Sequence, residues 1–147
     1  MKIGIASDHR GYDLKQELIK YLKNKNYEIT DYGTNSIENV DYTKYGFLLG
    51  EKVASHEVDY GIAICGSGIG ISIACNKVKG IRCARVTTIK DVRVTKKDNN
   101  ANVIAFSSDV NYDKVKRMIE EFINTPFSNE ERHIKRINKI SEYERLN

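Results

Sequence analysis

Short apolar runs alternate along this sequence with longer segments of helical periodicity, and this alternation limits the possible folds more than any other feature. Five strands are predicted, at residues 2–7, 28–32, 60–65, 82–86 and 102–107. The segments between them place apolar residues three or four positions apart, as Val115, Met118 and Phe122 do in the clearest helix. Strands that alternate with helices form parallel sheets with helices on both faces. The predicted fold class is therefore α/β: a three-layer α/β/α Rossmann-like domain with a five-stranded parallel sheet.

The other predicted helices follow the strands at residues 14–22, 42–55, 71–77 and 90–97. The only proline, Pro126, separates this body from a final charged helix at residues 128–144, whose narrow apolar stripe consists of Ile134, Ile137 and Ile140. A stripe this narrow is typical of packing on a partner, so we expect this helix to pack on the second subunit of a dimer. With 147 residues, the chain is expected to form a single domain spanning 1–147.

Charge and cysteine content exclude several classes of function. The formal net charge is +4, but basic and acidic residues are interspersed, so no nucleic-acid partner is expected. We find neither a signal peptide nor a stretch that could span a bilayer, and we expect no membrane partner. The three cysteines, Cys65, Cys75 and Cys83, lack CxxC spacing and are odd in number, which favours reduced thiols and a cytoplasmic location.

A glycine-rich loop follows the third predicted strand and opens the next helix. Ligands of open α/β sheets lie beyond the carboxyl ends of the strands, which is where this loop falls. Gly66, Gly68 and Gly70 allow its backbone to approach a ligand and to point N–H groups at an anion. Their spacing does not match the G-x-G-x-x-G fingerprint of dinucleotide sites.

Cys65 is the candidate catalytic residue, because it stands at the end of a strand and beside a helix N-terminus. This environment favours a thiolate that can serve as a base or a nucleophile. The alternative is a small buried apolar side chain, which is the role we expect for Cys75 and Cys83. Ser67 either caps the following helix, hydrogen-bonds an oxyanion of the substrate, or does both.

Five motifs spread over nearly the whole chain carry a family resemblance. They are Ser7-Asp8-His9-Arg10-Gly11, Asp41-Tyr42, the run ICGSGIGISIACNK at 64–77, NNANVIA at 99–105 and RHIKR at 132–136. With these motifs, in this order, the chain resembles the ribose-5-phosphate isomerase B and galactose-6-phosphate isomerase family.

The resemblance implies a cofactor-independent aldose–ketose isomerase of a small phosphorylated sugar, with ribose 5-phosphate and ribulose 5-phosphate as the expected pair. Cys65 would move a proton between C1 and C2, while Ser67 and the loop residues Gly66, Gly68, Ile69 and Gly70 would hold the enediolate. Such chemistry needs a base and donors aimed at the developing oxyanion. Neither a metal nor an organic cofactor is implied.

Further binding residues are implied by the same resemblance. Asp8, His9, Tyr42 and Asn99 would contact the sugar. Arg132 and Arg136, on one helix face at i, i+4 spacing, would hold the phosphate of the neighbouring subunit in a homodimer or tetramer. From the residues alone, Asp8 could equally cap the first helix, and the two arginines could belong to a solvated charged face.

Two departures from the family pattern concern the substrate. Asp98 stands where the family commonly has a histidine that helps to open the furanose ring, and we predict that Asp98 takes part in catalysis. Ser107-Ser108-Asp109 occupies a turn where many members carry a phosphate-binding arginine. Alternatives are therefore a diverged subunit of a hetero-oligomeric galactose-6-phosphate isomerase, an isomerase of tetrose phosphates, or a binding module without chemistry.

Overall fold

A parallel sheet of five strands forms the centre of the fold, as the sequence predicts. The computed structural model describes residues 1–147, and its strand order is β2-β1-β3-β5-β4. The strands are β1 (Lys2–Ser7), β2 (Glu28–Asp31), β3 (Tyr60–Cys65), β4 (Cys83–Arg85) and β5 (Val103–Ser107). The helices are α1 (Tyr12–Asn24), α2 (Tyr42–Ala54), α3 (Ile69–Asn76), α4 (Ile89–Asn99), α5 (Tyr112–Asn124) and α6 (Glu131–Leu146), with a 3-10 turn η1 (His9–Gly11) after β1.

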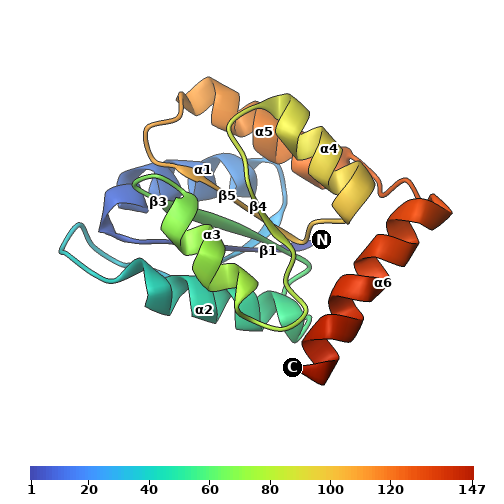
Figure 1. Cartoon of the computed structure of the whole chain (residues 1–147). Coiled ribbons are helices and arrows are strands. Elements are labelled where there is room, and N and C mark those ends of the chain that lie inside the picture. Colours follow the sequence, from blue (N-terminus) through green and yellow to red (C-terminus); the bar gives the residue numbers. More distant parts are fainter.

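The helices cover both faces of the sheet (Figure 1). Helices α1, α4 and α5 pack on one face, and α2 and α3 pack on the other. Successive side chains of a strand point to opposite faces, so Ile62 and Ile64 of β3 enter the first layer. Ala63 and Cys65 enter the second layer. The alternation along β3 therefore points the thiol of Cys65 towards the side of the sheet that carries α2 and α3.

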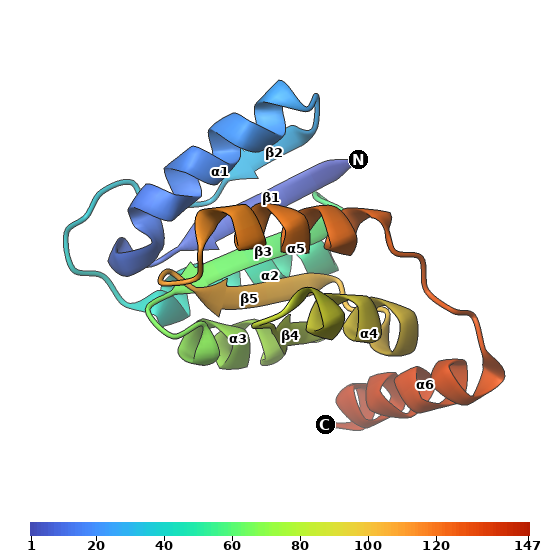
Figure 2. The same cartoon turned by 90° about the horizontal axis from the view of Figure 1, so that it is seen from above.

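Helix α6 lies apart from the three layers, beyond the amino ends of the strands (Figure 2). His133 is its only buried residue. Of the predicted apolar stripe, Ile134 is 37% and Ile140 is 49% exposed and Ile137 is half-buried, so this chain covers the stripe only in part. Packing of this helix on a partner subunit stays a prediction. None of the helices is both long and apolar enough to cross a membrane.

Several element boundaries differ from the sequence-based prediction. Helix α3 begins at Ile69, two residues early, because Gly68 at its N-cap has a φ of 75° and the chain turns directly into the helix. Helix α4 continues to Asn99, which places Asp98 in its last turn. Helix α6 begins at Glu131 rather than 128, because the Ser128 hydroxyl accepts the Glu130 N–H at 3.2 Å and shapes a turn before the helix.

Strand β4 is three residues long, shorter than predicted, and lies at the edge of the sheet. The side chain of Asn76 bonds to its outer side, accepting the Cys83 N–H at 2.8 Å and donating to the Cys83 carbonyl at 2.9 Å. An amide that pairs with a free edge in this way replaces the neighbouring strand. Cys83 is half-buried there, so the expectation of a fully buried side chain is wrong for this cysteine, whereas Cys75 is buried.

Candidate active site

A cavity of 340 Å³ lies at the carboxyl ends of β1 and β3. It is lined by Asp8, Arg10, Tyr42, Cys65, Gly66, Ser67, Ile69 and Gly70. Seven of these eight residues were expected at the site from the sequence, and Arg10 is the addition. The lining comes from three segments that are remote in the sequence. They meet because the parallel strands all have their carboxyl ends on the same side of the sheet.

Cys65 is 4% exposed, and its sulfur accepts a hydrogen bond from the N–H of Gly68 at 3.2 Å. A backbone N–H directed at sulfur stabilises the negative charge of a thiolate. Gly68 can occupy this position because it tolerates a φ of 75° and because it has no side chain. A Cβ atom on Gly68 would lie 2.5 Å from the carbonyl carbon of Phe106.

Three further residues fix the loop through its carbonyl groups. The Ser107 hydroxyl donates to the carbonyl of Gly66 at 2.6 Å, and the Ser108 N–H donates to that of Cys65 at 2.9 Å. Arg85 donates from Nε and Nη2 to the Ser67 carbonyl, at 3.2 and 3.0 Å. The turn at Ser107 and Ser108 thus supports the glycine loop. Sequence reasoning missed the support by Arg85, because no local pattern signals a contact between residues 18 positions apart.

Ser67 and Asp8 both show the capping roles that the sequence left open. The Ser67 hydroxyl accepts the N–H of Ile69 at 3.1 Å, at the start of α3. The Asp8 carboxylate accepts the N–H groups of Arg10 and Gly11 at 3.0 and 3.1 Å, so it caps η1 rather than α1. Capping does not exclude a second role, because both residues also line the cavity.

The imidazole of His9 lies beside the cavity rather than in its lining. Its Nδ1 atom accepts a hydrogen bond from the Val40 N–H at 3.2 Å. An accepting Nδ1 places the proton of a neutral imidazole on Nε2, which leaves Nε2 as a donor.

Tyr42 and Arg10 pack against two of the loop glycines. A Cβ atom on Gly70 would lie 2.6 Å from Cζ of the Tyr42 ring. A Cβ atom on Gly66 would lie 2.5 Å from Nη1 of Arg10. The absence of side chains at Gly66 and Gly70 therefore lets an aromatic ring and a guanidinium group lie directly on the loop.

Four other predicted residues do not line the cavity: Asp98 and Asn99 lie in the last turn of α4, and Arg132 and Arg136 lie on α6. Figure 2 shows α6 beyond the amino ends of the strands, away from the end that carries the cavity. Helix α4 starts beyond the carboxyl end of β4 and runs back over 11 residues, or about 16 Å. Asp98 and Asn99 therefore end up near the amino ends of the strands, beside α6. A single chain does not bring these four residues to Cys65.

These remote residues differ in their contacts within the chain. Asp98 lies 3.5 Å from Nε2 of His133, and Arg132 pairs with Glu130 at 2.9 Å. The carbonyl of Asn99 accepts a hydrogen bond from Nε of Arg82 at 2.9 Å. Arg136 is exposed and makes no ion pair or side-chain hydrogen bond.

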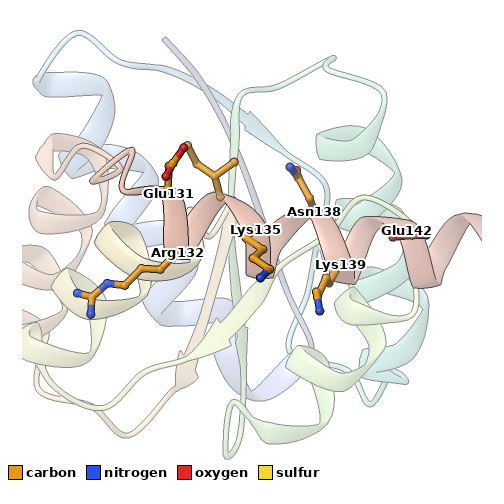
Figure 3. Close-up of a pocket in the computed structure, with 7 residues that line it drawn as sticks. Glu131, Arg132, Lys135, Asn138, Lys139 and Glu142 are labelled. Carbon is orange, nitrogen blue, oxygen red and sulfur yellow. The ribbon is translucent and has the colours of Figure 1, made fainter.

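A second hollow, of 630 Å³, follows the exposed surface of α6. Its seven lining residues all belong to this one helix, and Figure 3 shows their side chains extending from it. Lys135 and Lys139 point to one side, whereas Asn138 points to the other. A hollow lined by a single helix is helix surface without a covering element, so we place the candidate active site at Cys65 instead.

Comparison with known proteins identifies the family of this chain. A sequence model described as Ribose/Galactose Isomerase matches residues 3–140. The chain belongs to this family. The ribose/galactose isomerase membership confirms the sequence-based resemblance, and with it the assignment to the aldose–ketose isomerases.

Individual members of the family match over almost their whole length. Ribose-5-phosphate isomerase B of Escherichia coli K12 is 36% identical over 144 residues, covering 97% of this chain and 96% of that protein. The structure of ribose-5-phosphate isomerase B from Clostridium thermocellum matches with a TM-score of 0.96 and 44% identity, covering 99% of each chain. That of Mycoplasma genitalium, with bound ribulose-5-phosphate, matches with a TM-score of 0.94 and 37% identity, covering 99% of this chain and 97% of that chain. These structures confirm the predicted α/β fold.

Proposed function

We propose that this chain interconverts ribose 5-phosphate and ribulose 5-phosphate without a cofactor, with Cys65 as the base. The observation that carries the proposal is the hydrogen bond from the Gly68 N–H to the Cys65 sulfur, inside a cavity walled by the glycine loop. The relatives named as ribose-5-phosphate isomerase B support this substrate pair.

The reaction moves one proton between neighbouring carbons of the open-chain sugar. The Cys65 thiolate takes the proton from C2 of the aldose, which leaves an enediolate. The resulting thiol returns a proton to C1, and the proton of the C2 hydroxyl passes to the C1 oxygen, which gives the ketose. The Ser67 hydroxyl accepts the N–H of Ile69, so its own hydrogen is free to donate to an enediolate oxygen. The N–H of Gly70 in the first turn of α3 has no acceptor within the helix and adds a second donor.

We further infer that two copies of the chain complete each site. Four predicted site residues lie near the amino ends of the strands, whereas Cys65 lies at a carboxyl end: Asp98, Asn99, Arg132 and Arg136. They can therefore reach a Cys65 cavity only in another copy. The exposed apolar residues of α6, Ile134 and Ile140 among them, provide a surface for that copy to cover. A homodimer, alone or within a tetramer, follows from this arrangement. Location in the cytoplasm and organisation as one domain stay predictions.

An assay of the purified chain with ribose 5-phosphate tests the proposed reaction, with four- and six-carbon aldose phosphates for comparison. Cys65→Ala is expected to abolish turnover and to change substrate binding by less than about tenfold, because the thiolate acts in the transition state. Turnover that survives Cys65→Ala would refute the assignment of the base.

Dimers that contain two different variants test whether each site is built from two chains. If Arg136 binds the phosphate of the neighbouring site, Cys65→Ala chains and Arg136→Ala chains are each nearly inactive alone. A dimer that contains one of each has one site with both residues intact, and activity should return. No recovery in verified mixed dimers would place Arg136 outside the neighbouring site.

A second candidate is one subunit of a galactose-6-phosphate isomerase that contains two related chains. The observation that favours it is Asp98, which replaces the histidine expected for furanose opening and lies 3.5 Å from His133. The LacB subunit of this isomerase from Clostridium acetobutylicum is 45% identical over 105 residues, covering 71% of this chain and 61% of that protein. Turnover only after mixing with a related chain would favour this candidate over the first.

A further inference from the structure

Arg10 contributes the only basic side chain to the lining of the Cys65 cavity. Its backbone N–H is fixed by the Asp8 carboxylate at 3.0 Å. Its guanidinium lies on Gly66, where a Cβ atom would be 2.5 Å from Nη1 and 2.7 Å from Cζ. The position of the charge beside the residue that follows Cys65 therefore depends on the missing side chain of Gly66.

The guanidinium of Arg10 makes no ion pair and no hydrogen bond within the chain, and the residue is exposed. Arg85, the other arginine close to the loop, donates from two nitrogens to the Ser67 carbonyl and is engaged in holding the backbone. The five donor hydrogens of Arg10 thus have no acceptor within the chain, and the residue is exposed in the lining of the cavity.

An anionic substrate needs a positive charge near the carboxyl ends of β1 and β3, where the cavity lies. The turn at Ser107 and Ser108 provides none, because it supports the carbonyl groups of Gly66 and Cys65. Arg132 and Arg136 lie on α6, beyond the amino ends of the strands of the same chain. Arg10 is therefore the cation that each chain supplies to its own cavity, and a guanidinium can bind a phosphate through two parallel hydrogen bonds.

The charge of Arg10 could stabilise either the enediolate or the far end of the substrate, and the exposure of Arg10 decides between them. The sulfur of Cys65 is nearly inaccessible, so the reacting carbons must lie deep in the cavity. The donors for an enediolate are already supplied there by Ser67 and the start of α3. An exposed guanidinium is better placed for the end of the substrate that projects towards the mouth of the cavity.

We propose that Arg10 binds the phosphate group of the sugar phosphate, and thereby selects phosphorylated sugars over neutral ones. This inference rests on the proposed isomerase function. It adds to the cavity a phosphate-binding residue from the chain that also supplies Cys65, and it assigns Gly66 the task of making room for that residue.

The test compares Arg10→Gln and Arg10→Lys with wild type and with Arg93→Gln. Arg93 is a suitable control, because it is exposed and pairs with Glu121 at 2.6 Å, away from the cavity. In Arg10→Gln we expect KM for ribose 5-phosphate, and Ki for inorganic phosphate as a competitor, to rise roughly 10- to 100-fold. We expect kcat to stay within about threefold, because a phosphate contact is made equally in the ground and transition states. Arg10→Lys should retain part of the affinity, and Arg93→Gln should match wild type.

Calorimetric titration with inorganic phosphate separates this inference from the proposed function, since it needs no turnover. Phosphate that binds wild type but not Arg10→Gln supports the inference even if no isomerisation is found. Equal KM and equal phosphate affinity in wild type and in a folded Arg10→Gln would overturn it. A fall in kcat with KM and phosphate affinity unchanged would also overturn it, since Arg10 would then act on the enediolate.

Discussion

The Nε2 atom of His133 lies 3.5 Å from the Oδ1 atom of Asp98, and this contact joins the C-terminal helix to the last turn of α4. On the other side of the ring, Nδ1 lies 2.8 Å from the hydroxyl of Ser128. His133 is the only buried residue of α6, and this pair of contacts, together with the bond from the Gly80 N–H to the Glu144 carboxylate at 2.6 Å, holds the helix in place. Asp98 therefore has a positioning role towards α6 in addition to any role at a partner's site.

The first prediction follows from this positioning role. Asp98→Ala should loosen α6, so that its backbone amides exchange with solvent roughly threefold to tenfold faster than in wild type. Lys97→Ala is the matched control, because Lys97 is the exposed neighbour of Asp98 on the same helix and only its backbone carbonyl contacts the chain leading to α6. Hydrogen exchange read by mass spectrometry measures the effect. Unchanged exchange in Asp98→Ala would remove the positioning role.

The second prediction concerns the substrate consequence of an aspartate at position 98. Opening a furanose requires proton transfer to the ring oxygen, for which a histidine is better suited than a carboxylate that is ionised at neutral pH. An aldose 4-phosphate of four carbons cannot close a furanose, because its O4 is esterified. We expect a higher ratio of kcat/KM for tetrose phosphate over ribose 5-phosphate than in relatives with the histidine, and a lower ratio in Asp98→His.

One result would contradict that prediction directly. If wild type prefers ribose 5-phosphate, and Asp98→Ala reduces its turnover nearly as much as Cys65→Ala does, then Asp98 is itself the acid that opens the ring. A carboxyl group in that role would have to be protonated at the partner's site.

The third prediction uses the different surroundings of the three thiols. The hydrogen bond with Cys75, together with burial, raises the pKa of the Cys83 thiol well above its ordinary value. Cys83 therefore stays protonated as the pH rises through the ordinary range of a thiol, whereas the sulfur of Cys65 accepts the Gly68 N–H at 3.2 Å and Cys65 lines the cavity. Near neutral pH, iodoacetamide should label Cys65 first, and labelling of Cys83 should increase only at strongly alkaline pH. Equal labelling of all three in the folded protein would support a purely structural role for Cys65.

The fourth prediction isolates the collision at the catalytic loop. Gly68→Ala should lower the free energy of unfolding by more than about 1 kcal/mol, because its Cβ atom would meet the Phe106 backbone at 2.5 Å. Gly80→Ala is the matched control: Gly80 has a φ of 92°, but its Cβ atom would find the nearest atom only at 3.7 Å. Denaturant titration and turnover measure the two effects. Equal destabilisation by both substitutions would mean that backbone conformation alone, and not the contact with Phe106, requires Gly68.

Local patterns in the sequence carry most of the fold. The five strands are apolar runs that differ clearly from the helical periodicity around them, so their order and parallel pairing follow from general rules of α/β proteins. The start of α6 and the short β4 are less predictable, because their limits depend on side-chain contacts such as Ser128 with Glu130 and Asn76 with Cys83.

The candidate site divides in the same way. Cys65, Ser67 and Asp8 could be predicted because they lie where strands end, a position that the sequence defines. Arg10 and Arg85 could not be singled out, since charged residues in turns and on edge strands are usually solvated, and only their approach to Gly66 and Ser67 distinguishes them.

The contact between Arg10 and Gly66 links two residues that are 56 positions apart. A Cβ atom at position 66 would lie 2.5 Å from Nη1 of Arg10, and this guanidinium is the far end of a flexible, exposed side chain. A larger residue at position 66 would therefore turn Arg10 away from the loop. Substitution at position 66 would thus change the charge beside Cys65 without any change at position 10.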